Sequence, residues 1–187
     1  MPPILDRLAQ PPTVYPPMQA DLGQQTYYLV CMTCHGDRGQ GLTDEFRALI
    51  GTPESNCWQS HCHASNHPRE GFVFPHEVPP VVSDVIREQF TTALQLHNFI
   101  AAKMPYQAPG SLSSSDYWNL TAYLLRANGV MVNVAFLDEQ TAASIILAKP
   151  TAQPTPVYLF LLVALVLGAG LIFLLVIVIR IYGIGRK

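Results

Sequence analysis

Two cysteines three positions apart, Cys31 and Cys34, are followed at once by His35. Two thiols at this spacing can reach the two vinyl groups along one edge of a porphyrin, and the next side chain is then close enough to bind the iron. A Cys-x-x-Cys pair alone is also typical of half a zinc site or of a thioredoxin-like redox pair. The histidine and the glycine-rich stretch 36–41, which lets backbone pack close to a large flat ligand, favour covalent attachment of haem c to Cys31 and Cys34.

The surrounding sequence resembles the class I cytochromes c. Residues 23–31 are similar to the amino-terminal helix that leads into the haem motif of that family. The segment 103–106, Lys-Met-Pro-Tyr, and a helix over 114–126 are similar to its distal-ligand segment and carboxy-terminal helix. The resemblance covers residues 20–130 and implies an all-α class I cytochrome c domain with a long loop insertion, whose covalent haem c relays single electrons.

The resemblance also implies that His35 and Met104 are the axial ligands of the haem iron. A thioether facing a histidine raises the reduction potential and saturates the iron, which suits an electron carrier that need not bind substrate. For Met18, Met32 and Met131, side-chain packing is the simpler interpretation. Met104 differs from them because a proline and a predicted helix follow it.

Capping residues and apolar spacing predict two helices around Met104. Ser113 is a good N-cap for a helix over 114–126, and Asn128-Gly129 supplies a stop. A helix over 91–103 would deliver Met104 just after its end. No stretch alternates in the manner of a strand, which agrees with an all-α domain. The apolar face of the later helix contains Tyr117, Leu120, Tyr123 and Leu124.

Cys57 and Cys62, with His63 directly after them, form a second cysteine motif that has two interpretations. The spacing Cys-x4-Cys-His serves haem attachment in some multihaem cytochromes, and His63 would then bind a second haem. The alternative is a disulfide between Cys57 and Cys62 in an oxidising compartment. We favour the disulfide because a single Met-Pro segment follows the first motif and no glycine-rich loop follows His63. The histidines available as the other ligand of a second haem are His61, His67, His76 and His97.

Residues 157–179 form a stretch of 23 residues without a charge. At about 1.5 Å per residue, a helix of this length crosses the roughly 30 Å hydrocarbon core of a bilayer. Arg180, Arg186 and Lys187 follow it, so the positive-inside rule makes the basic tail 180–187 cytoplasmic. The sequence thus predicts a single-pass protein of the bacterial cell membrane, with its haem domain on the periplasmic or extracellular side.

The segments on either side of the haem domain are rich in proline. Residues 1–19 predict an extended arm, and the linker 131–156 ends in a semi-rigid proline-rich spacer. Residues 1–10 lack the apolar core of a secretory signal, so either the carboxy-terminal span drives export or the chain starts further upstream.

The charge balance points to protein partners. The chain has eleven Lys and Arg, of which three lie in the tail, and thirteen Asp and Glu. The part before the membrane span, residues 1–156 (the head), therefore carries eight positive and thirteen negative residues, a net charge of −5. An acidic head suits a partner with a basic docking patch and gives no reason to expect nucleic acid. The expected partners are the membrane, a soluble electron carrier and other subunits of a membrane electron-transfer complex. By resemblance of role, the host complexes to consider are alternative complex III, cytochrome bc-type assemblies, photosynthetic reaction centres and terminal oxidases.

Three other functions are compatible with the same residues. A dihaem protein would use both cysteine motifs as a short electron wire. A haem-based sensor would release Met104 from the iron to bind a small ligand. A zinc-stapled interaction module would use all four cysteines, which requires Cys31 and Cys34 to give up the haem. No Ser-His-Asp or paired-carboxylate arrangement rises above chance, so the chain is predicted to be an electron-transfer subunit rather than a catalyst by itself.

Overall fold

All regular elements that the structure describes are helices. In this computed structural model, Thr92 and Ile146 form an isolated antiparallel bridge, and no strand occurs in the described part of the chain. The predicted all-α class is confirmed. The described residues are 6–51, 56–130, 136–147 and 157–183.

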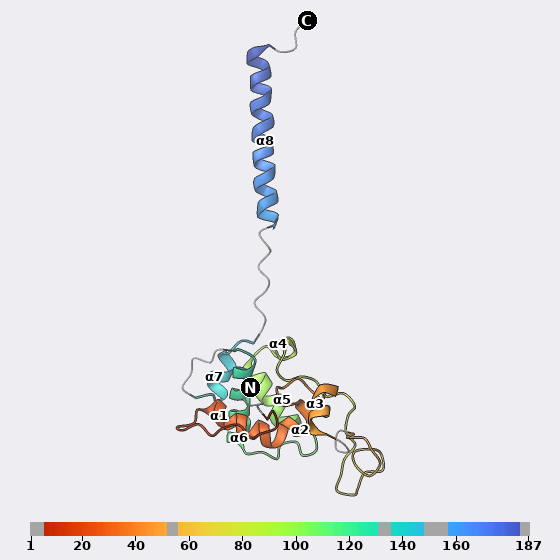
Figure 1. The fold of residues 1–187 in the computed structure, drawn as a ribbon. Helices are drawn as coiled ribbons and strands as arrows, with labels where there is room; N and C mark the ends of the chain where they lie inside the picture. The colour runs from red at the N-terminus through yellow and green to blue at the C-terminus, as the bar shows by residue number, and fades with distance from the viewer. Residues whose placement is uncertain (1–5, 52–55, 131–135, 148–156, 184–187) are drawn as a thin grey trace, which may run out of the picture. The chain divides into compact units, whose positions relative to one another are not determined.

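The chain divides into two compact units, residues 1–149 and 150–187. The first contains the short helices in Figure 1, and the second contains α8. The elements of the first unit are α1 (Gln19–Thr26), the π-helix η1 (Tyr27–Cys31), α2 (Met32–His35), α3 (Asp44–Ile50), α4 (Asp84–Gln89), α5 (Ala93–Lys103), α6 (Ser114–Ala127) and α7 (Glu139–Ser144).

Helices α1 and α6 lie far apart in the sequence and pack against each other at very close range. Gly23 of α1 permits this contact, because a Cβ atom at that position would lie 1.9 Å from the carbonyl oxygen of Asn119 in α6. Arg126 of α6 donates a hydrogen bond to the carboxylate of Asp21 in α1 at 2.6 Å, and this lowers the pKa of Asp21. The crossing fixes the direction in which α1 enters η1 and α2.

Side-chain caps set the starts of the two helices that flank Met104. The Thr92 hydroxyl accepts a hydrogen bond from the backbone N–H of Gln95 at the start of α5. The Ser113 hydroxyl accepts one from the N–H of Asp116 at the start of α6. Both helices were predicted, and their observed bounds differ from the predicted ones by at most two residues. Met104 is the C-cap of α5, as the predicted end of that helix requires.

Residues 136–147 belong to the core of the first unit, although they fall within the predicted linker 131–156. The side chains of Leu137 and Leu147 are each 1% exposed. The side chain of Gln19 in α1 hydrogen-bonds the backbone N–H and carbonyl of Leu137, at 2.7 and 3.0 Å. The other parts of the predicted linker, 131–135 and 148–156, lie outside the described residues.

His97 of α5 is the most unusual polar side chain of this core. It is 8% exposed, and its ring stacks on that of Trp118 in α6 with the centroids 3.4 Å apart. Its Nδ1 lies 3.2 Å from the hydroxyl oxygen of Thr121. Burial lowers the pKa of His97 below its usual 6.5, so the folded state keeps this imidazole neutral.

The buried His97 should make the fold sensitive to mild acid. The unfolded chain takes up a proton at the usual pKa, whereas the folded chain resists it. The contribution of His97 to the free energy of unfolding is therefore fully present above pH 6.5, and it is lost as the pH falls through the lowered pKa of the folded state. Between pH 7 and 5, guanidinium unfolding should show a slope of at most about 1.4 kcal/mol per pH unit from this group. His97→Gln should flatten the slope in that window only; an unchanged slope would show that His97 does not cause it.

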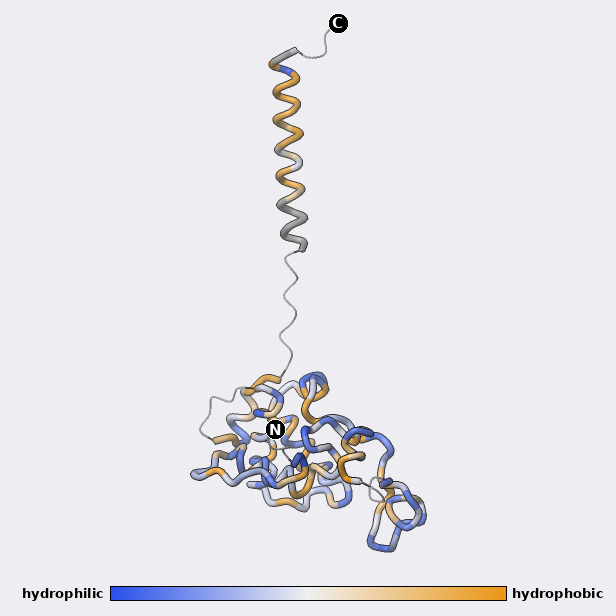
Figure 2. The backbone as a smooth tube through the Cα atoms, viewed as in Figure 1, coloured by the Kyte–Doolittle hydropathy of each residue, from blue (hydrophilic) through white to orange (hydrophobic). Residues whose placement is uncertain are grey.

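Helix α8 (Val157–Tyr182) forms the second unit. It is long and apolar enough to cross a membrane, with its strongest window at Ala164–Ile181. Figure 2 shows hydrophobic residues along most of the coloured part of this helix. Arg180 is a basic residue of its last turn. One carboxy-terminal apolar helix, suited to anchor the protein in a membrane, agrees with the predicted span 157–179.

Candidate functional site

One cleft of the first unit brings together the four side chains that the sequence predicts for haem binding. Cys31, Cys34 and His35 line it with Met104, which lies 69 positions beyond His35 in the chain. The cleft encloses about 530 Å³ including its open mouth. The rest of its lining is mostly apolar, so the residues present fit a large hydrophobic macrocycle such as haem. The other lining residues are Tyr27, Val30, Val81, Ile100, Pro105, Tyr106, Gln107, Leu120 and Leu124.

The local backbone explains how both thiols reach the cleft. α1 continues into the five-residue π-helix η1, a rare geometry that is frequent at functional sites. Cys31 ends η1, and Cys34 lies three positions later in α2, so helical spacing puts both side chains on one face. α2 ends directly after His35 because Gly36 turns the chain with a positive φ of 84°, which glycine adopts readily and other residues rarely do. Neither the π-helix nor this abrupt end was predicted.

His35 is oriented by a backbone carbonyl from a distant part of the chain. Its Nδ1 lies 3.0 Å from the carbonyl oxygen of Pro79. Since a carbonyl only accepts hydrogen bonds, the ring proton sits on Nδ1 and Nε2 keeps the lone pair that a metal needs. Burial lowers the pKa of His35, which also favours the neutral imidazole. The carbonyl of Gly39 accepts from the N–H of Val81 at 2.8 Å, and this ties the loop after His35 to the segment that carries Pro79.

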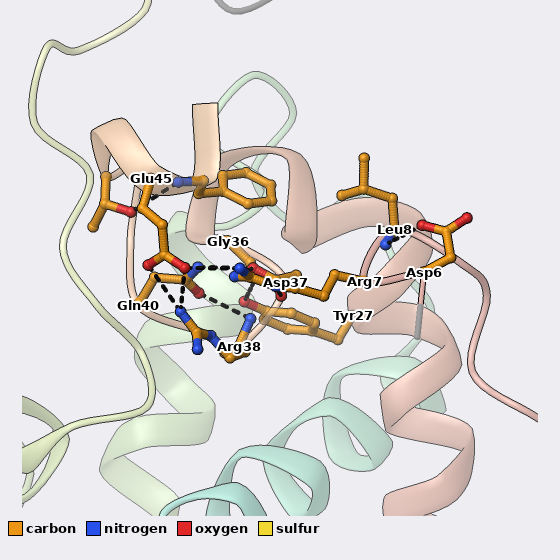
Figure 3. Close-up of polar contacts among 11 residues, drawn as sticks. Asp6, Arg7, Leu8, Tyr27, Gly36, Asp37, Arg38, Gln40 and Glu45 are labelled. Atoms are coloured by element: carbon orange, nitrogen blue, oxygen red, sulfur yellow. Dashed lines mark hydrogen bonds and ion pairs between the residues drawn. The ribbon is translucent and has the colours of Figure 1, made fainter. Parts of the chain in front are cut away.

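The amino-terminal arm is attached to the same loop (Figure 3). Arg7 donates two hydrogen bonds to the carboxylate of Asp37, at 2.7 and 2.8 Å, and one to Glu45 at 2.7 Å. Gln40 donates to Asp37 at 2.7 Å. Burial would raise the pKa of Asp37, but the hydrogen bonds from Arg7 and Gln40 outweigh it and the net shift is downward. The hydroxyl of Tyr27 donates to the carbonyl of Gly36 at 2.7 Å in the same region.

Arg7 and Asp37 were not predicted as site residues. The arm 1–19 was predicted from its prolines to be extended, and the described residues 6–18 contain no helix. Arg7 nevertheless contacts the protein's own glycine-rich loop. An acidic residue in a loop of three glycines was the one available signal, and it does not indicate which basic residue pairs with it.

Met104 is held at its backbone by both neighbouring helices. Its N–H donates to the carbonyl of Ile100 in α5 at 2.9 Å. Its own carbonyl accepts from the hydroxyl of Tyr117 in α6 at 2.7 Å. The side chain is left to line the cleft, so the predicted distal ligand shares one site with the predicted proximal one.

The electrostatics of the first cysteine motif argue against thiolate chemistry. Burial raises the pKa of Cys31 to about 12 and that of Cys34 to about 11, so both sulfurs are neutral at physiological pH. A thioredoxin-like redox pair depends on a thiol with a lowered pKa. Among the described residues, no group of three or more His, Cys, Asp or Glu side chains is arranged to hold a metal ion. The zinc interpretation therefore has no support in the part of the chain that the structure describes.

The second cysteine motif lies in the loop between α3 and α4 and does not line the cleft. Cys57 and Cys62 are unbonded thiols in this structure. The N–H of His63 donates to the carbonyl of Cys57 at 3.0 Å, which closes residues 57–63 into a loop. Nδ1 of His63 lies 3.1 Å from the carbonyl oxygen of Phe72, and their rings are 4.5 Å apart. His61, His67 and His76 lie in the same loop, whereas His97 is part of the core.

Comparison with known proteins identifies the family. The family model described as cytochrome c oxidase, cbb3-type, subunit III matches residues 18–124, which is more than half of the chain. The match includes Cys31, Cys34, His35 and Met104. Neither the curated proteins nor the solved structures give a match. The chain belongs to this family and is a class I c-type cytochrome, whose domain binds haem c covalently and transfers electrons.

Proposed function

We propose that the protein is a membrane-anchored cytochrome c that relays single electrons as a subunit of a membrane electron-transfer complex. Cys31 and Cys34 would hold one haem through thioether bonds, with His35 and Met104 as axial ligands of its iron. The observation that carries the proposal is the convergence of these four side chains on one apolar cleft. The haem supplies a one-electron iron couple when bound.

The residues of the chain would orient this couple and tune it. The carbonyl of Pro79 orients His35 through Nδ1, and such a partner increases the basicity of a ligating imidazole. The thioether of Met104 favours the reduced iron. Leu120 and Leu124 belong to the apolar lining that excludes water from the site, and exclusion of water also raises a reduction potential.

Replacing Met104 with Ala tests the distal ligand. The oxidised wild-type protein should show the weak sulfur-to-iron band at the red end of its spectrum, and Met104→Ala should lose that band. The reduction potential should also fall, because the thioether no longer favours the reduced iron. Met18→Ala is the matched control, since Met18 is 63% exposed and lies outside the cleft. Persistence of the band in Met104→Ala would exclude this ligand.

We propose one haem per chain, with Cys57 and Cys62 joined in a disulfide. The hydrogen bond from the N–H of His63 to the carbonyl of Cys57 draws the two ends of the motif together, which supports such a bond. A second haem is the other candidate, and one contact favours it. The carbonyl of Phe72 hydrogen-bonds Nδ1 of His63, just as the carbonyl of Pro79 hydrogen-bonds Nδ1 of His35. The intact mass of the denatured chain decides between them. One added haem supports the single relay, and two would make the protein a dihaem wire.

We further propose that the haem domain faces the periplasm or the cell exterior. The support is the position of Arg180 at the end of α8, followed by Arg186 and Lys187. Protease added to intact spheroplasts should remove the head and leave the tail.

The acidic head would dock on a basic patch of a soluble carrier or of another subunit. Binding of carbon monoxide to the reduced iron would instead support the haem-based sensor.

A further inference from the structure

A single tyrosine hydroxyl bridges the two ends of the loop that carries Met104. The side chain of Tyr117, 4% exposed, projects from the first turns of α6. Its hydroxyl donates to the carbonyl of Met104 at 2.7 Å and accepts from the N–H of Leu112 at 3.4 Å. A phenol has one donor and free acceptor lone pairs, so both bonds can form at once. The Tyr117 hydroxyl therefore links the backbone at the two ends of the segment 104–112.

The other backbone hydrogen bonds within this loop are local. The N–H of Ala108 donates to the carbonyl of Pro105 at 2.9 Å, and that of Ser111 to Ala108 at 3.2 Å. They form successive turns and do not connect the loop to α6. The Tyr117 hydroxyl makes that connection, at the residue that presents its thioether to the cleft. A shift of Met104 out of the cleft would pull its carbonyl away from the hydroxyl.

We propose that Tyr117 is a positioning residue that favours the iron-bound state of Met104. This inference rests on the proposed function, in which Met104 is the distal ligand. An external ligand that replaces the thioether must move the Met104 segment and break the bond from Tyr117. The hydroxyl thus resists displacement of Met104, which keeps the protein an electron carrier and opposes its use as a ligand-binding sensor.

The chain provides two matched controls for this role. Tyr27 is 3% exposed and also donates a 2.7 Å hydrogen bond to a backbone carbonyl, but that carbonyl belongs to Gly36, next to His35. Tyr123 lies on α6 like Tyr117, and its hydroxyl makes no hydrogen bond within the described residues. Tyr27→Phe therefore removes an equal bond on the other side of the cleft, and Tyr123→Phe removes none.

The test is a titration of the oxidised full-length holoprotein with imidazole. Tyr117→Phe should bind imidazole about fivefold more tightly than the wild type, the ratio expected from one net hydrogen bond. Tyr123→Phe should stay within about twofold of the wild type. Tyr27→Phe also alters the cleft lining, but on the His35 side, so its gain in imidazole affinity should be smaller than that of Tyr117→Phe. Wild-type affinity in Tyr117→Phe, or an equal gain in Tyr27→Phe, would overturn the proposal. A general loss of stability would raise the affinity of both buried variants.

Two further measurements keep the outcome interpretable. If Met104→Ala retains the red band of the wild type, the proposed function itself is wrong. If Met104→Ala loses the band but Tyr117→Phe titrates like the wild type, only the positioning role is wrong. The Leu112 amide of the wild type should also be protected from hydrogen exchange, because Tyr117 accepts its proton. Rapid exchange of the Leu112 amide would contradict the hydrogen bonding by Tyr117, even if the Tyr117→Phe variant did not fold.

Discussion

Replacement of Gly23 by Val should strongly destabilise the haem domain. The Cβ alone would lie 1.9 Å from the carbonyl oxygen of Asn119 and 2.9 Å from the backbone nitrogen of Leu120. Both are backbone atoms of α6, so no rotamer change can relieve the clash and the helices must separate. We expect a loss of about 3 kcal/mol or more, out of a total that is typically 5–15 kcal/mol. Guanidinium unfolding, followed by the haem absorption of the solubilised protein, measures the loss.

A neighbouring residue supplies the control for Gly23→Val. Leu22 lies on the same helix and is 44% exposed, so Leu22→Ala should change the unfolding free energy far less. Gly23→Ala should fall between the two, because alanine favours the helix by about 1 kcal/mol but still places its Cβ in the clash. A Gly23→Val protein as stable as the wild type would show that α1 and α6 do not cross at this glycine.

Local signals in the sequence predicted the elements around the site correctly. Ser113 was expected to cap a helix over 114–126, and its hydroxyl caps α6, which begins at Ser114. Capping depends on atoms three residues apart, so a short stretch of sequence contains the whole signal. The same holds for α5 and for α8, where length and apolar composition are sufficient.

Contacts between distant residues could not be predicted in the same way. The ion pair of Arg7 with Asp37 spans 30 positions, and the carbonyl that orients His35 belongs to Pro79, 44 positions away. Residues 136–147 contribute Leu137 to the core although the surrounding sequence reads as a linker. Many apolar or charged residues could have filled each of these places, and only the folded chain selects one.

The hydrogen bonds of the Tyr117 hydroxyl could not be predicted from the sequence either. Helical spacing placed this residue on the buried face of its helix, and it is buried. The spacing treats the ring as an apolar body and says nothing of where the hydroxyl points. Its partners, Met104 and Leu112, become visible only when the loop between α5 and α6 has a structure.

Removing both thiols of the first motif should release the haem from the denatured chain. In Cys31→Ser/Cys34→Ser no thioether can form at the cleft, so acid extraction should take all haem out of the polypeptide. The haem content of the denatured chain should fall to zero, measured as the intact mass and as the haem-to-protein ratio. The serines keep the size of the side chains, so haem that enters the cleft without a covalent bond can still be ligated by His35 and Met104.

The matched variant Cys57→Ser/Cys62→Ser should keep its covalent haem and lose only the proposed disulfide. A cross-link over so short a loop stabilises a protein by roughly 2 kcal/mol in the chain-entropy model, and this is the loss expected on guanidinium unfolding. If instead each double variant keeps one haem and the wild type carries two, His63 is a haem ligand and the disulfide is excluded. If both double variants keep the same covalently bound haem mass as the wild type, neither cysteine pair holds the haem. Only a loss confined to Cys31→Ser/Cys34→Ser assigns a single covalent haem to the cleft that also contains His35 and Met104.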